Sequence, residues 1–411
     1  MEPDNLKIAE YIAKCYLRTN IDKKEALFYM EKAFLTNPNP SPDIIFEYGQ
    51  ALTYHLRFDE AKTYFQQYKN LNKGDYQKKV DLAIKNCDAS IELIQKPLNI
   101  SFTNLGENVN SSFDDYYPFV SKNDSTLYFT SRRKGNLGGS KEFDGLYPSD
   151  IYSYLLHNPI AKAKNLGKAI NTTGDDQVVG LSNDGRTLFI YFDMIEYYGD
   201  LYMAINANGR FSRNFKIDET VNSKYLETSG SLSTDGQSLF FASNRPGGFG
   251  GLDLYITRKL PDGTWALPQN LGKTINTTEN EDFPQLSADG KTLYFSSTGH
   301  PGMGGADIFI SDWNEDDNIW SSPINVGYPL NTPEDNMTIS FSENDKFAYV
   351  SAHRDDSFGN LDIYRVEFHN NMSNKAVFIF TLDGVNTDET TEMVISDEQN
   401  EIIGIYHPNK K

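Results

Sequence analysis

The sequence predicts a multidomain protein of the α + all-β class, in which a helical part precedes a long repetitive β part and a short further β segment. Over residues 1–95, apolar side chains recur at helical spacing. From residue 98 the apolar period changes to two, and residues typical of tight turns become frequent. A pattern of four strands then recurs roughly every 50 residues as far as residue 369, which is the sequence signature of a β-propeller.

The helical part contains an internal repeat. Ala26 and Met30 have the same spacing as Ala61 and Phe65, which follow 35 residues later. Gly49 precedes Ala61 by twelve residues, at a point where the two helices of a hairpin must approach closely. These residues resemble the tetratricopeptide repeat, and the resemblance implies a concave groove for a peptide or partner helix. The alternative is a plain helical bundle that only shields the rest of the chain.

Turn and capping residues predict the boundaries of the helices. Asn37-Pro38 ends the first helical pair, and Ser41 or Asp43 can cap the next helix. Residues 74–95 predict a final helix that caps the array, with apolar residues on one face.

The β part repeats two chemical signatures. Each repeat has a polar hairpin turn that supplies positive φ angles. The turns are Asn123-Asp124, Asp184-Gly185, Asp235-Gly236, Asp289-Gly290 and Asn344-Asp345. Each repeat also has a third strand that starts at an aspartate, namely Asp150, Asp200, Asp253, Asp307 and Asp362. We predict that these aspartates are structural, because such carboxylates accept hydrogen bonds that hold a blade together.

A fourth segment with the letters Asn-Leu-Gly follows the third strand at residues 165–167 and 270–272. The fifth repeat lacks this segment after Phe368, whereas Asn104-Leu105-Gly106 precedes the first repeat. We therefore expect strand 98–105 to pair with the fifth repeat and close a ring of five blades, which removes free sheet edges. The predicted domains are a helical domain at 1–95 and a five-bladed propeller at 98–369.

Residues 98–368 resemble the TolB-type (WD40-like) propeller repeat, and the Ser-Asn-Arg-Pro-Gly-Gly run at 243–248 is distinctive. Together with the helical repeats, they resemble the periplasmic OmpA-family proteins of the Bacteroidetes, some of which serve type IX secretion. That architecture implies a small β-sandwich like a carboxypeptidase regulatory domain, followed by a peptidoglycan-binding OmpA domain. Residues 375–411 fit the start of such a sandwich, with strands at 377–380 and 392–395, and the chain contains no OmpA domain.

Charge excludes several classes of partner. The 411-residue chain has a net charge of −19, while residues 1–95 hold 13 basic and 14 acidic side chains, so the β part carries nearly all the excess. An acidic surface repels phosphate backbones and anionic lipid, so we expect no nucleic-acid partner. Basic protein surfaces, cations and neutral glycans remain as partners.

Cysteine content and apolar patterning bear on the compartment. Cys15 and Cys87 are expected to be unpaired core thiols. No stretch approaches ~18 apolar residues, so no membrane span is expected. The N-terminal residues lack a signal segment, which leaves a cytoplasmic protein or a trimmed mature chain open. The resemblance implies the periplasm, in association with the outer membrane.

A second polar series occupies the start of each inner strand, and it comprises Asp115, Asp176, Glu227, Glu281 and Asn336. Inner strands line the propeller axis, so we expect these groups to gather near one mouth of the channel. Converging carboxylates raise one another's pKa values or bind a cation or a basic segment. The alternative is that each pairs with polar groups of the adjacent blade.

Arg133, Arg245 and Arg354 align in the loop after the second strand of the first, third and fifth repeats. Their guanidinium groups either pair with the acidic series or bind a carboxylate or glycan. We group these arginines with the polar series as candidate binding residues at the channel mouth.

No motif favours catalysis. The six histidines show no metal-ligand spacing, and no Gly-x-Ser-x-Gly motif is present. We predict no catalytic residue, no metal and no cofactor.

The leading hypothesis is a non-enzymatic periplasmic scaffold that binds protein partners at the outer membrane or cell wall. The resemblance adds a role in type IX secretion and contact with peptidoglycan through a further C-terminal domain. A glycan- or peptidoglycan-binding module is the alternative, because abundant Tyr and Phe beside acids suit sugar stacking. The third hypothesis is a propeller hydrolase, which needs a carboxylate pair in the channel mouth.

Overall fold

The computed structural model describes residues 6–19, 22–35, 39–71, 77–121, 124–158, 160–193, 199–207, 209–342, 345–369, 393–396 and 402–406. By its contacts the chain divides into two compact units, Met1–Asn370 and Asn371–Lys411. None of the helices in the described part combines the length and apolarity needed to span a bilayer.

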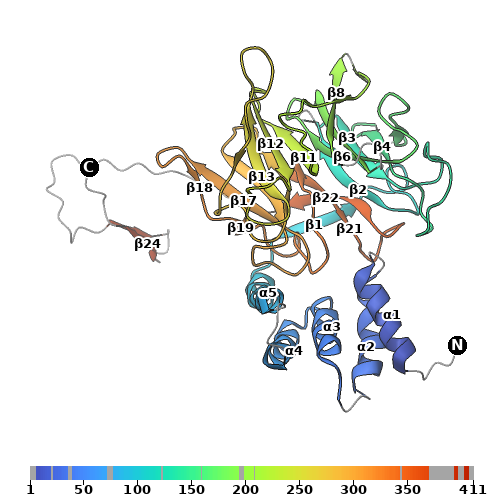
Figure 1. The fold of residues 1–411 in the computed structure, drawn as a ribbon, viewed down its shortest axis with the longest axis vertical. Helices are drawn as coiled ribbons and strands as arrows, with labels where there is room; N and C mark the ends of the chain where they lie inside the picture. Colours follow the sequence, from blue (N-terminus) through green and yellow to red (C-terminus); the bar gives the residue numbers. More distant parts are fainter. Residues whose placement is uncertain are drawn as a thin grey trace. The chain divides into compact units, whose positions relative to one another are not determined.

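The described part of the N-terminal region contains five helices (Figure 1). They are α1 (Leu6–Arg18), α2 (Glu25–Leu35), α3 (Pro42–Thr53), α4 (Phe58–Leu71) and α5 (Gln77–Gln95). Helix α1 packs against α2, α3 against α4, and α4 against α5. Ser41 takes the position before α3 without a side-chain capping bond, while Pro42 provides the first turn. Asn37-Pro38 lies outside the described residues.

The spacing of small and aromatic residues gives the helices their packing. Ala26, Met30 and Ala61 are completely buried. A Cβ atom at Gly49 would lie 2.7 Å from a ring carbon of Phe65, so glycine allows α3 and α4 to approach closely. The predicted close approach at Gly49 is therefore confirmed. The identity of these helices as tetratricopeptide repeats stays a prediction.

The β part forms five sheets within the described residues, and each sheet is a blade of antiparallel strands. Blade one contains β2 (Asp115–Val120), β3 (Thr126–Ser131), β4 (Asp150–Leu155) and β5 (Lys164–Asn165). Blade two contains β6 (Asp175–Leu181), β7 (Thr187–Asp193), β8 (Leu201–Ala207) and β10 (Phe215–Lys216), with β9 (Arg210–Phe211) paired to β8. Blade three contains β11 (Glu227–Leu232), β12 (Ser238–Ser243), β13 (Asp253–Arg258) and β14 (Gln269–Asn270).

The last two blades complete the predicted number. Blade four contains β15 (Glu281–Leu286), β16 (Thr292–Ser297), β17 (Asp307–Asn314) and β19 (Ile324–Asn325), with β18 (Ile319–Trp320) paired to the end of β17. Blade five contains β20 (Ser340–Phe341), β21 (Phe347–Ala352), β22 (Asp362–Phe368) and β1 (Ile100–Asn104). The five-bladed propeller predicted from the sequence is the fold of this part of the chain.

The outer strand of blade five comes from the segment just after the helices. Strand β1 pairs antiparallel with β22, with Ile100 opposite Phe368 and Asn104 opposite Tyr364. This is the pairing expected from the position of Asn104-Leu105-Gly106, and it joins the two ends of the propeller in one sheet.

Hairpin turns have the predicted left-handed backbone. In the five predicted turns, the residues with positive φ are Asp124, Gly185, Gly236, Gly290 and Asp345, with φ between 51° and 75°. Asn123 and Asn344 lie outside the described residues.

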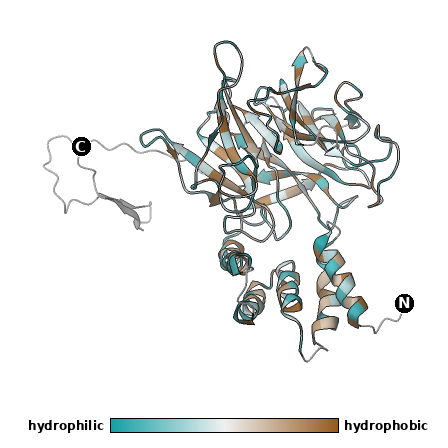
Figure 2. Cartoon of the chain, viewed as in Figure 1, coloured by the Kyte–Doolittle hydropathy of each residue, from teal (hydrophilic) through white to brown (hydrophobic). Residues whose placement is uncertain are grey.

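Apolar side chains from neighbouring blades pack together in shared clusters. Ile151 of blade one, Val178 and Phe189 of blade two, and Phe241 of blade three are completely buried in one cluster. Figure 2 shows the corresponding mixture of hydrophobic (brown) and hydrophilic (teal) residues along the strands and along the helices.

The helices and the propeller belong to one compact unit, and a loop of blade four packs into the helical core. Met303 is completely buried in the helical core. Beside it, the Gly302 amide donates to Asn86 Oδ1 at 3.1 Å, and Ser90 Oγ donates to the Gly302 carbonyl at 3.3 Å. Lys23 Nζ lies 3.5 Å from a carboxylate oxygen of Glu334.

The C-terminal unit contains one described hairpin, formed by β23 (Met393–Ser396) and β24 (Ile402–Tyr406). The predicted strand at 377–380 lies outside the described residues. The β-sandwich expected for residues 375–411 stays a prediction.

Gly49→Val tests the close approach of α3 and α4. The added side chain collides with Phe65, so we expect the free energy of unfolding to fall by about 1–3 kcal/mol. Chemical denaturation followed by far-UV circular dichroism measures the change. The control is Gln66→Val, at an exposed position of α4. Equal stability of the two variants would contradict the packing described here.

Candidate functional site

In three of the five blades, the third-strand aspartate bonds both to the preceding loop and to the outer strand. Asp150, Asp253 and Asp362 each accept a hydrogen bond from an asparagine amide of the outer strand, at 2.5–2.8 Å. The donors are Asn165, Asn270 and Asn104, in the same order. Each aspartate also accepts a backbone amide of the preceding loop. Asn104 on β1 therefore makes the bond in blade five that Asn165 makes in blade one.

Blades two and four depart from this arrangement. Lys216 stands where the other blades have asparagine, and its ammonium group lies 2.6 Å from Asp200. In blade four, Asp307 accepts the amides of Met303 and Gly304, at 2.5 and 3.4 Å. Its other oxygen, and the side-chain amide nitrogen of Asn325, are buried without a hydrogen-bond partner among the described residues. Burial raises the pKa of Asp307 to about 7.

A series of asparagines that sequence reasoning did not assign a role joins successive blades. Each accepts the amide and donates to the carbonyl of one third-strand residue in the preceding blade. The pairs are Asn171 with Ile151, Asn222 with Leu201, Asn276 with Leu254, Asn331 with Ile308, and Asn110 with Ile363. The recurring Ile-Asn-Thr letters at 170–172 and 275–277 were the signal that could have revealed this role.

The predicted polar series at the inner strands is held within the blades. Asp115, Asp176, Glu227 and Glu281 are completely buried. Each accepts hydrogen bonds from the backbone amide and the hydroxyl group of the residue four positions earlier. Asn336 accepts the same two bonds from Thr332, at 2.7 and 3.3 Å.

Two of the three predicted arginines pair with this series. Arg133 Nη2 lies 2.5 Å from Asp115 and donates to the Val109 carbonyl at 2.6 Å. Arg245 Nη2 lies 3.0 Å from Glu227. The Nε atom of each arginine donates to a serine at the end of the second strand, at 2.6 and 3.0 Å. The arginine–acid pairing expected as one alternative is thus present in blades one and three.

Blades two and four have no such arginine. Burial raises the pKa of Asp176 to about 7, and it also raises the pKa of Glu281. In blade four, His300 Nε2 lies 2.8 Å from the Ile275 carbonyl, which corresponds to the Val109 carbonyl used by Arg133. Burial lowers the pKa of His300.

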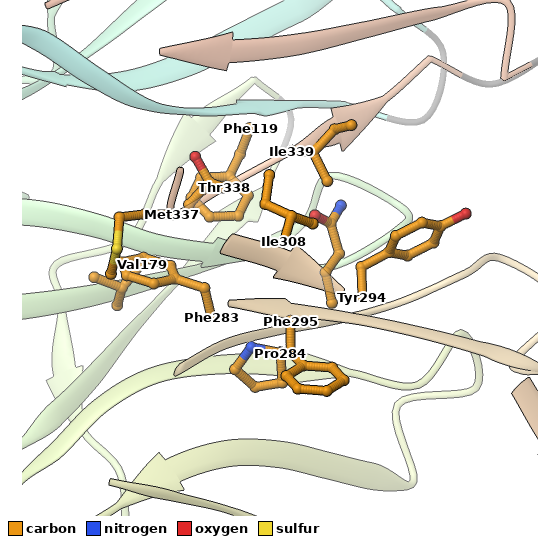
Figure 3. A pocket seen from close by; sticks show the side chains of 11 residues that line it. Phe119, Val179, Phe283, Pro284, Tyr294, Phe295, Ile308, Met337, Thr338 and Ile339 are labelled. Carbon is orange, nitrogen blue, oxygen red and sulfur yellow. The ribbon is translucent and has the colours of Figure 1, made fainter. Parts of the chain in front are cut away.

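The propeller axis is largely filled. Tyr117 of blade one and Phe283 of blade four have ring centroids 4.6 Å apart. Figure 3 shows the adjacent cavity, where Phe119, Val179 and Phe283 approach from different blades. Its volume of about 10 Å³ is close to the minimum for one water molecule. Within the described part of the chain, no group of three or more His, Cys, Asp or Glu is placed to hold a metal ion.

Three larger cavities open to solvent. The helical groove, about 480 Å³, runs along α1, α3, α4 and α5. The Arg354 cavity, about 410 Å³, lies where blades five and one meet the turn before α2, and both Arg354 and Asn336 line it. The rim groove, about 810 Å³, lies between the outer parts of blades three and four. The binding role predicted for the arginines and the polar series stays a prediction.

Comparison with known proteins adds only likeness in fold. No family model and no curated protein matches the chain. TolB from Acinetobacter baumannii is 14% identical, with 70% of each chain covered and a TM-score of 0.39. A putative TolB from Agrobacterium tumefaciens is 15% identical over 66% of this chain and 98% of that chain, with a TM-score of 0.35. A structure described as a glycoside hydrolase is 9% identical over 72% and 98%, with a TM-score of 0.46. The assignment as a five-bladed propeller rests on the strand pairing itself.

Asp176→Asn tests the effect of a buried carboxyl without an arginine. An unfolded Asp titrates near pH 3.9, so between about pH 4 and 7 the folded state keeps a proton on Asp176 that the unfolded state has lost. This group therefore lowers the free energy of unfolding by up to about 1.4 kcal/mol per pH unit as pH rises through that window, with no further effect above it.

The asparagine variant should flatten this slope, because it can accept the bonds from Thr172 as Asn336 does from Thr332. Urea denaturation at a series of pH values measures the slope. Asp184→Asn, at a half-exposed turn carboxylate, is the control. An unchanged slope in the Asp176 variant would argue against the raised pKa.

Proposed function

We propose that the chain is a non-enzymatic scaffold that binds protein partners in the periplasm, near the outer membrane and cell wall. The observation that carries the proposal is the helical groove. The resemblance to periplasmic OmpA-family proteins supports the compartment. A link to type IX secretion, and contact with peptidoglycan through a further domain, form the finer part of the same proposal.

The helical groove has the composition of a peptide site. Its walls come from α1, α3, α4 and α5, and its lining residues are Lys14, Leu17, Arg18, Asp43, Phe46, Glu47, Gln50, Tyr68 and Lys79. Its volume of about 480 Å³ lies in the range of ligand sites, roughly 300–1,000 Å³. Apolar and aromatic side chains provide contact area, and long charged side chains flank them.

Charges in the groove favour an acidic or amphipathic segment. Glu47 lies 3.5 Å from Lys14 Nζ and 3.2 Å from Arg18 Nη2, so two cations share one carboxylate. Lys79 Nζ lies 5.3 Å from the centroid of the Phe46 ring, which leaves its charge at the groove surface. A partner segment with carboxylates and apolar side chains would satisfy both features.

The buried carboxylates of the blades support a non-enzymatic role. A hydrolase needs two carboxyl groups that face a substrate. Asp115, Glu227 and Glu281 have no exposed surface, and each is bonded to groups of its own blade or the adjoining loop. Their hydrogen bonds are those of structural groups.

Photo-crosslinking in cells of the source organism tests the scaffold proposal. We expect benzoylphenylalanine at Gln50, inside the helical groove, to give a discrete adduct with a protein partner. The same group at Gln66, on the exposed side of α4, is the control position. Combining the Gln50 probe with Lys79→Glu should reduce the adduct, because it inverts the charge beside Phe46. The proposal fails if Gln50 and Gln66 give the same adducts, or if the charge reversal changes nothing.

The rim groove favours a second candidate function, the binding of glycans or peptidoglycan fragments. Trp313 and Trp320, from β17 and β18, have ring centroids 5.1 Å apart, and Trp313 is half-buried. Hydrogen-bonding side chains of Asp235, Gln269 and Asn270 line the same open groove. An aromatic face beside polar groups suits a sugar ring.

Calorimetric titration with muropeptides tests this candidate. Trp313→Ala should weaken binding about tenfold, because an aromatic face contributes about 1.4 kcal/mol. The Lys79→Glu variant, altered in the helical groove, should bind as the parent does. Absence of heat with the parent, or equal affinity of the Trp313 variant, would eliminate the rim groove as a glycan site.

A further inference from the structure

Comparison of the blades with one another singles out Arg354. In blades one and three, the corresponding arginines each bond to a serine, a backbone carbonyl and a buried carboxylate. These contacts occupy the guanidinium groups of Arg133 and Arg245 within the fold. An arginine at this position is therefore held within the fold when a serine, a carbonyl and a carboxylate are all within its reach.

Blade five lacks two of the three groups that occupy the other two arginines, the serine and the carboxylate. Ala352 stands opposite Asp362, where blade one has Ser131 opposite Asp150. Asn336 stands where blade one has Asp115, and a neutral amide forms no ion pair. Within the part of the chain that the structure describes, the Arg354 guanidinium group has no hydrogen-bond or ion-pair partner.

Aromatic rings support the unpaired guanidinium group. Its central carbon lies 3.9 Å from the centroid of the Phe102 ring and 6.0 Å from that of Tyr364. Stacking on Phe102 holds the planar group while leaving its N–H donors unused. Phe102 belongs to β1, so the strand that closes the ring also positions this arginine.

The guanidinium group lines a cavity of suitable size. The Arg354 cavity measures about 410 Å³, and Tyr116, Tyr117 and Met337 contribute to its walls. The lysine and the other arginine that line it are occupied. Lys23 lies 3.5 Å from Glu334, and Arg132 lies 2.5 Å from Asp144. Arg354 is therefore the guanidinium or ammonium group of the described lining that is available to a ligand.

We propose that the Arg354 cavity binds the carboxylate group of a peptide, with the Arg354 guanidinium group donating two parallel hydrogen bonds to it. A carboxylate matches the planar fork of arginine. In blade one the Arg133 guanidinium group already pairs with a carboxylate, that of Asp115, through Nη2.

The acidic groups of the cavity favour a peptide over a simple anion. Its acidic lining residues are Asp22, Asp114, Glu334 and Asp335, and a peptide offers such carboxylates backbone N–H donors. Inorganic phosphate carries more negative charge and offers no comparable donors, so the same carboxylates disfavour it.

The experiment uses the full chain with ¹³C-methyl methionine, in which the Met337 signal reports on the cavity. Assignment comes from Met337→Leu, and the protein has eight methionines in total. The probes are acetyl-trialanine with a free C-terminus, its C-terminal amide, acetyl-Ala-Glu-Ala amide, and inorganic phosphate. We expect millimolar binding of at least one carboxylate peptide, seen as a titrating shift of the Met337 signal. Binding of the free acid identifies a chain end, and binding of the glutamate peptide identifies an acidic side chain.

Asn336→Asp is the decisive variant. It restores the carboxylate of blades one and three, so it should pair with Arg354 and weaken peptide binding at least tenfold without lowering the thermal midpoint. Arg354→Gln should abolish binding and also leave the midpoint unchanged. Arg133→Gln and Arg245→Gln, by contrast, should lower the midpoint, because their guanidinium groups complete their blades.

Four outcomes would overturn the proposal. The first three are equal binding of the amide without a carboxylate, a response to phosphate but to no peptide, and full binding by the Asn336→Asp protein. The fourth is the absence of any Met337 shift at millimolar peptide. Lys79→Glu alters the helical groove and should leave the Met337 titration unchanged. Failure of the helical groove as a binding site would therefore leave this test of the Arg354 cavity valid.

Discussion

The ring of blades depends on a single repeated interaction, the pairing of a buried asparagine side chain with both backbone groups of one third-strand residue. Buried N–H and C=O groups require partners, and the asparagine amide supplies an acceptor and a donor in one plane. Asn171 joins blade two to Ile151 of blade one in this way. Asn110 joins the closing segment to Ile363 of blade five with the same two bonds. The junction between the chain's early and late parts is therefore chemically the same as every other junction of the ring.

Because the blades share this framework, their differences are informative. The position beside the buried acid is held by arginine in blades one and three, whereas His300 bonds to the corresponding carbonyl in blade four. Lys216 replaces an asparagine in blade two and converts a hydrogen bond into an ion pair. In blade five the acid itself is replaced by Asn336, and Arg354 stacks on Phe102 instead of pairing with a carboxylate. Where a side chain at one of these positions is not needed by the shared framework, it is available to bind a ligand.

The insertion of Met303 gives the helices a fixed relation to blade four. Met303 is completely buried among helical side chains, and the amide and carbonyl of Gly302 bond to Asn86 and Ser90 of α5. Burying one large apolar side chain contributes roughly 1.5–3 kcal/mol, and the two polar bonds specify its position. A partner held in the helical groove would thus be presented next to the propeller.

The sequence by itself determined the helical region, the number of blades and the closing strand, because short-range patterns of residues predict each of them. Apolar periods, hairpin residues such as Asp184-Gly185 and the displaced Asn104-Leu105-Gly106 depend only on short-range rules of backbone geometry. The roles of the aligned arginines could not be determined in this way. Arg133 and Arg354 occupy equivalent positions, and only the tertiary structure decided that the first meets Asp115 while the second faces a cavity. The reason is that a side chain's electrostatic role depends on the groups that folding brings to it from other segments of the chain. For Arg354 these groups include Phe102, which lies far away in the sequence, and Asn336, which lies in an earlier segment of the same repeat.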